Sequence, residues 1–151
     1  MTKISTIYDA LLTAIATALA GGGYRQLPNS YDITDNPEPY LRRGYGLAFG
    51  VSENTNREIC ERLWQRQSFT LPITNEVLTT STNTTGWDDA MKGLMEDFIK
   101  VAKAIEDEPQ IDESAQSVQV GVGGIAFLEG DRGKYVLIEI SIDVEFYENL
   151  S

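Results

Sequence analysis

The stretch that decides the fold runs from residue 135 to residue 147 and reads YVLIEISIDVEFY. A large apolar residue occupies every second position: Val136, Ile138, Ile140, Ile142, Val144 and Phe146. Successive side chains of a β-strand point to opposite faces of the sheet, so the pattern predicts one long strand with a buried face and a solvent-exposed face. The other elements must therefore cover one face and leave the other in water.

A partner strand for this stretch precedes it in the chain. Its apolar residues also alternate, at Val118, Val120, Val122, Ile125 and Phe127. The pair Gly123–Gly124 interrupts the alternation and predicts a β-bulge. The segment 129–133, EGDRG, has the composition of a tight turn. The last third of the chain is therefore predicted to be a long hairpin.

Two amphipathic helices are predicted to cover the apolar face of the sheet. The first spans about residues 4–19, with apolar residues at spacings of three and four, and ends at Gly21–Gly23. The second spans about residues 87–106, and Trp87 at its start is expected to act as a hydrophobic staple. The acidic residues 106–113 are expected to form a solvated connector.

The middle of the chain predicts a second hairpin, with strands near residues 45–51 and 58–73 and a turn at 52–56. Proline and polar residues predict a long irregular loop at about 24–43 and a polar loop at about 74–86. The predicted fold is a single α+β domain over residues 1–151, in the order α-β-β-α-β-β. Two helices pack on one face of an antiparallel or mixed sheet of about four strands.

Composition narrows the functional classes. Twelve basic and twenty-three acidic residues give a net charge of −11, and no basic stripe of the nucleic-acid-binding kind is present. No apolar run is long enough for a membrane span. The single cysteine, Cys60, excludes an intramolecular disulfide and is typical of a reducing compartment, so we expect synthesis in the cytoplasm.

Catalytic patterns are not found. The chain has no histidine, which removes Ser/His and Cys/His nucleophilic arrangements. The glycines at 21–23 follow a helix, whereas a phosphate-binding loop follows a strand. Glu139, Asp143 and Glu145 share the wet face of the last strand, where acids can bind Mg²⁺ or Ca²⁺, but a solvated face is the simpler interpretation. We predict no enzyme activity, no cofactor and no metal.

The order of elements over nearly the whole chain resembles the tail terminator proteins of long-tailed, lambda-type bacteriophages. The resemblance rests on the opening helix, the strand-like stretches 46–51 (GLAFGV) and 67–73 (QSFTLPI), the helix at 87–106 and the final strand 135–147. It implies a virion protein that forms a hexameric ring on the tail tube, stops tube polymerisation and offers a surface for head-completion proteins. DNA would pass through as a repelled polymer, and no membrane would be involved.

We predict three groups of candidate residues. The acidic lumen or rim would contain Glu139, Asp143 and Glu145. A subunit interface would contain Arg57, Arg62, Trp64 and Arg66. Loops that contact the tube or the neck would contain Tyr31, Tyr40, Arg42, Arg43 and Asn83.

Three other readings remain open. The first is another neck, head–tail connector or tail-completion protein of the same kind of virus. The second is a small cellular module that binds a ligand or a protein. The third is a metal-dependent enzyme built on the acidic strand face.

Overall fold

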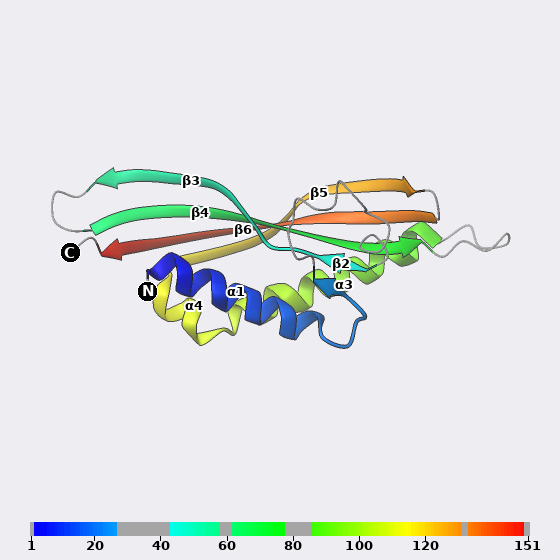
Figure 1. Ribbon diagram of the computed structural model, residues 1–151, viewed down its shortest axis with the longest axis horizontal. Helices are drawn as coiled ribbons and strands as arrows, with labels where there is room; N and C mark the ends of the chain where they lie inside the picture. The colour runs from blue at the N-terminus through cyan, green and yellow to red at the C-terminus, as the bar shows by residue number, and fades with distance from the viewer. Residues whose placement is uncertain (1, 27–42, 58–61, 78–85, 131–132, 150–151) are drawn as a thin grey trace.

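The computed structural model describes residues 2–26, 43–57, 62–77, 86–130 and 133–149. It is an α+β fold in which a long, twisted sheet has its helices along one side (Figure 1). The elements in chain order are α1 (Lys3–Leu19), β1 (Arg25–Gln26), β2 (Gly44–Tyr45), β3 (Ala48–Arg57), β4 (Arg62–Val77), α3 (Gly86–Glu106), α4 (Pro109–Ser114), β5 (Ser117–Gly130) and β6 (Gly133–Asn149).

The six described strands form one mixed sheet in the order β1-β2-β4-β6-β5, and β3 also pairs with β4. The antiparallel pair of β4 and β6 runs unbroken from Arg62↔Asn149 to Val77↔Lys134. The short pair of β1 and β2 is the parallel part of the sheet. Strands β4 and β6 therefore form the centre of the sheet; β5 lies at one edge, and β3 and β1 lie along the other.

The predicted alternation in the last strand is confirmed. The six alternating apolar residues of β6, Val136, Ile138, Ile140, Ile142, Val144 and Phe146, are 0% exposed. Their partners on β4 include Phe69, Leu71 and Ile73, which are buried as completely. The inner faces of α1 and α3 complete the core with Ile7, Leu11, Ile15, Leu94, Val101 and Ile105.

Both ends of α1 follow from local chemistry. The Thr2 side chain accepts a hydrogen bond from the Ser5 amide at 3.3 Å, as an N-cap residue does. The Lys3 amide donates to both carboxylate oxygens of Glu148 at 3.0 Å, which places a negative charge at the positive end of the helix dipole. Gly21 follows the helix with a φ of 81°, so the predicted glycine terminator is confirmed.

The bulge predicted at Gly123–Gly124 is confirmed by a register shift between Val122 and Gly124. Val122 lies opposite Ile140, and Ile125 lies opposite Ile138. The extra residue moves the helix-side side chains of β5 from even to odd positions, because partners directly across an antiparallel pair share a face.

The predicted counts of four strands and two helices are wrong, and so is the simple α-β-β-α-β-β order. The described residues contain six strands and three helices. The acidic segment at 106–113 is not only a connector, because Pro109–Ser114 forms α4. Pro109 suits the first turn of a helix, the Glu108 side chain accepts from the Gln110 amide, and Ile111 is buried at 1% exposure.

Two predicted boundaries are also wrong. The turn expected at 52–56 is part of β3, whose pairing with β4 continues to Arg57 through two register shifts. Residues 74–77, expected in a loop, continue β4 because β6 is long enough to pair with them. Residues 25–26 and 44–45 pair as β1 and β2, whereas most of the segment between them lies outside the described residues.

Candidate assembly surfaces

The two edge strands expose large apolar side chains. On β3 these are Phe49, 54% exposed, and Val51, 73% exposed; on β5 they are Ile125 and Phe127, 56% and 63% exposed. The stretch of β5 from Ser117 to Leu128 contains no charged residue. Native edge strands usually carry charge, proline or irregularities that prevent pairing with another chain. Apart from its bulge, β5 lacks these features, and no other strand of the described residues pairs with its outer edge.

Phe49 is a fixed aromatic side chain that lies half outside the protein. Its ring stacks on Tyr8 of α1 with centroids 4.9 Å apart, and it lies 5.1 Å from the ring of Phe69. These contacts hold Phe49 on the helix side of the β3 edge. Offset and tilted ring pairs of this kind restrict the orientation of the exposed ring.

A cavity of about 630 Å³ lies on the helix side of the other edge. It is bounded by the end of α3, by α4 and by the start of β5, with Ala102, Ile105, Glu106, Ile111, Asp112, Ala115, Gln116, Ser117, Val118 and Val120 as its lining. The lining combines alanine, isoleucine and valine side chains with the carboxylates of Glu106 and Asp112. The cavity therefore offers apolar surface beside acidic groups.

The outer face of the sheet carries a mixed polar cluster. Arg66 donates to Glu145 at 2.5 and 3.1 Å, and Ser68 donates to Asp143 at 2.5 Å. The hydrogen bonds to Glu145 raise the pKa of Arg66 above its usual value, and the charges of Glu145, Glu53 and Asp143 add to this effect. Arg66 was predicted at a subunit interface and Glu145 in an acidic face; the structure brings them together within one chain.

The remaining predicted residues are spread over the chain. Glu139 is exposed on the outer face, and Trp64 is half-buried on β4 opposite Tyr147. Arg57 and Arg62 belong to β3 and β4 by their backbones, but their side chains are outside the described structure. Tyr31, Tyr40, Arg42, Asn83 and Cys60 lie outside the described residues.

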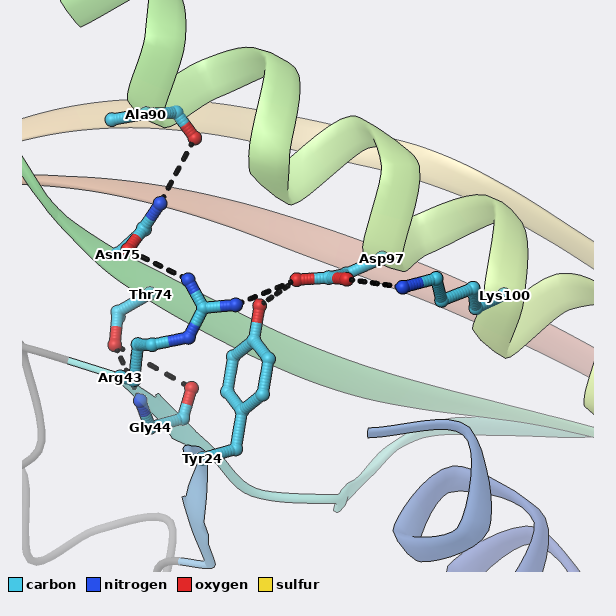
Figure 2. A network of polar contacts seen from close by, with 8 residues as sticks. All are labelled: Tyr24, Arg43, Gly44, Thr74, Asn75, Ala90, Asp97 and Lys100. Carbon is cyan, nitrogen blue, oxygen red and sulfur yellow. Dashed lines mark hydrogen bonds and ion pairs between the residues drawn. The ribbon is translucent and has the colours of Figure 1, made fainter. Parts of the chain in front are cut away.

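Arg43, the remaining candidate, is at the centre of a polar network (Figure 2). Its guanidinium donates to Asn75 at 3.0 Å and to Asp97 at 3.1 Å, and it lies over the Tyr24 ring at 4.5 Å from the centroid. Tyr24 donates to the same Asp97 oxygen at 2.5 Å. Lys100 pairs with the other Asp97 oxygen at 3.6 Å. The network ties the chain on both sides of residues 27–42 to α3 and β4.

Burial shapes the chemistry of this network. Burial, followed by the hydrogen bond to Asp97, raises the pKa of Tyr24, so the tyrosine hydroxyl stays protonated and remains a donor. The Nε atom of Arg43 is buried and finds no acceptor among the described residues.

The Trp87 ring, expected as a staple within its own helix, packs edge-on against Phe127 of β5, with the ring centroids 5.0 Å apart.

Two further findings concern metal sites and membrane-spanning helices. In the described ranges, no group of three His, Cys, Asp or Glu residues is placed to hold a metal ion. None of the described helices is both long enough and apolar enough to cross a membrane.

Comparison with known proteins gives no family assignment. No family model matches the sequence, and no curated protein matches it significantly. Among solved structures, the fimbrial biogenesis protein PilO from Pseudomonas aeruginosa is 10% identical with a TM-score of 0.28; the match covers 91% of this chain and 65% of PilO. A chain from the virion of the native gene transfer agent particle is 10% identical with a TM-score of 0.35, over 93% of this chain and 91% of that one. The chain thus spans about two thirds of PilO, and neither TM-score is high enough to show a shared fold.

Proposed function

We propose that this protein is a structural component of a tailed-phage virion that forms a ring at the end of the tail tube. There it stops tube polymerisation and provides the surface on which the head is joined. The observation that carries the proposal is a long sheet whose described helices all lie on one side, and whose strands β3 and β5 pair with no further described strand on their outer sides. The resemblance of the element order to tail terminator proteins supplies the specific role.

The strand directions suit head-to-tail assembly. β3 is antiparallel to β4, β4 to β6, and β6 to β5, so the two edge strands run in opposite directions. If β5 of one copy lies beside β3 of the next, the new pair is antiparallel and all helices stay on the same side. Such a heterologous contact generates a closed ring when the rotation between copies closes.

The charge suits a channel that DNA crosses without binding. The chain carries a net charge of −11, so a ring of six copies carries 6 × −11, or −66. If the outer sheet face lines the bore, Glu139, Asp143 and Glu53 contribute carboxylates to it. Like charges repel the phosphates of a passing genome. The partners are then the tube protein, the head-completion protein and further copies of this chain, and the role needs no catalysis or cofactor.

Deleting the coding sequence from the virus that carries it tests this function. We expect lysates with over-long, headless tail tubes in electron micrographs, because nothing ends polymerisation at the correct length. Expression of the protein from a plasmid should restore normal tails. Tubes of normal length that fail to join heads would contradict a terminator and indicate the alternative role of a neck or connector protein.

One observation favours a second function, that of a small ligand-binding module. The cavity beside β5 has a volume of about 630 Å³, which lies within the range of small-molecule pockets. Native mass spectrometry of the protein purified from cells distinguishes this function. A monomer that carries a small apolar molecule would favour it over the ring.

A further inference from the structure

We propose that the contact between copies is a knob in a hole, in which Phe49 of one copy enters the cavity beside β5 of the next. This inference deepens the proposed function and rests on it for ring closure. The contact itself needs only two copies of the chain. The knob is the exposed ring of Phe49 on the β3 edge, and the hole is the cavity lined by Val118, Val120, Ala115 and Ile105.

The strand register places knob and hole at the same level of the sheet. Phe49 is opposite Phe69 on β4, Phe69 is opposite Ile142 on β6, and Ile142 is opposite Val120 on β5. These four residues form one row across the sheet, and partners in a row share a face. Phe49 and Val120 therefore end the same row at opposite edges, both on the helix side. A second copy placed edge to edge without stagger brings its Phe49 beside Val120.

Neighbouring rows are compatible with the same contact. The next row joins Ser52 to Val118, and the row that contains Arg66 joins Glu53 to Ser117. In these rows no two like charges lie directly opposite each other, so the rows add no charge repulsion to the contact. A stagger of two residues towards the start of β5 places Phe49 beside Val118 instead, and Val118 also lines the cavity.

Size and chemistry also match. The cavity is larger than a phenyl ring, and its apolar side chains are half-buried or buried in the single chain. The Phe49 ring is stacked on Tyr8 of its own chain, so little conformational freedom is lost when the ring docks. The uncharged backbone edge of β5 supplies antiparallel hydrogen bonds along the same contact. One contact thus covers two exposed features that a single copy leaves open.

Disulfide trapping tests the contact directly. In a Cys60→Ser background, Ala48→Cys is combined with Gly121→Cys or, for the staggered contact, with Gln119→Cys, and the protein is oxidised at high concentration. Ala48 and Gly121 end the row next to Phe49, so these changes leave the Phe49 ring and the cavity lining intact. The two positions are three strand spacings apart within a chain, about 14 Å, which is too far for an internal disulfide. We expect a ladder of linked copies on a non-reducing gel, ending at the mass of the ring. Absence of the ladder in both combinations would overturn the proposal.

Single-cysteine variants are the matched controls. Ala48→Cys or Gly121→Cys alone should stay monomeric on the same gel. Efficient dimers of Gly121→Cys alone would instead indicate a two-fold contact between two β5 edges. A small molecule that co-purifies in the cavity and blocks the ladder would also overturn the proposal.

A mixing experiment tests the direction of the contact. Phe49→Glu removes the knob and keeps the hole, whereas Val120→Lys blocks the hole and keeps the knob. Each variant alone should be monomeric, and an equal mixture should form a heterodimer of twice the 16.7 kDa chain mass. Ala16→Glu, on the exposed face of α1, should assemble like the unmodified protein. A mixture that stays monomeric, while the unmodified protein associates, would overturn the proposal.

The outcomes separate this contact from the viral role. A ladder together with normal tails in the deletion virus would keep the contact and refute the terminator function. Over-long tails without any ladder would keep the function and refute the contact.

Discussion

Replacing Ile140 with alanine is expected to lower the free energy of unfolding by about 3 kcal/mol. Ile140 is 0% exposed on the central strand β6, between Leu71 of β4 and Val122 of β5. The substitution removes buried methyl and methylene groups and leaves a cavity that neighbouring strands cannot close. Urea denaturation followed by circular dichroism measures the change.

The neighbouring residue supplies the control. Ser141 points to the outer face, is partly exposed and lies between Thr70 and Gly121. Ser141→Ala should change the free energy of unfolding by less than about 0.5 kcal/mol, as surface substitutions usually do. Equal losses of unfolding free energy in Ile140→Ala and Ser141→Ala would contradict a sheet with one buried and one solvent-exposed face.

Replacing Asp97 with alanine is expected to cost about 2 to 3 kcal/mol in unfolding free energy. The side chain is 11% exposed and accepts from both Arg43 and Tyr24. Its removal leaves a guanidinium that is 31% exposed without its carboxylate partner, beside a tyrosine hydroxyl without an acceptor. Thermal and urea unfolding of the purified variant measure the loss.

Two further variants show whether the network is the cause. Lys100→Ala removes an exposed ion pair to the same carboxylate and should cost less than about 0.5 kcal/mol, because exposed pairs contribute little. The double variant Arg43→Met, Asp97→Ala should lose less unfolding free energy than the sum of the losses of the two single variants. The reason is that it has no Arg43 guanidinium left without its carboxylate partner. Strict additivity would contradict the coupling of Arg43 to Asp97.

The long hairpin and the two amphipathic helices were predictable because their signals are local. Apolar residues repeat every two positions in β6 and about every 3.6 positions in α1, and each repeat shows which side chains are buried. The pair Gly123–Gly124 marked the bulge. Helix α4 was missed because six residues carry only one buried apolar side chain, Ile111. Strands β1 and β2 were missed because two-residue strands depend on partners that are remote in sequence.

The candidate surfaces were less predictable because they depend on register between distant strands. The alternation of β3 placed Phe49 on an apolar face, but only the edge position of β3 leaves its ring half exposed. The pairing of Arg66 with Glu145 likewise follows from their direct register. One signal for the polar network was available: Asp97 falls in line with the buried residues Leu94 and Val101 of α3. A carboxylate in that stripe needs partners, and Arg43 and Tyr24 supply them.

Image averaging of the protein bound at the end of its tail tube tests the central claim most directly. The account predicts a closed, sixfold ring in which neighbouring sheets join edge to edge, β5 against β3, with the helices outside and the carboxylate-bearing strand faces towards the bore. Single copies or two-fold pairs at the tube end, or a bore lined by helices, would contradict it.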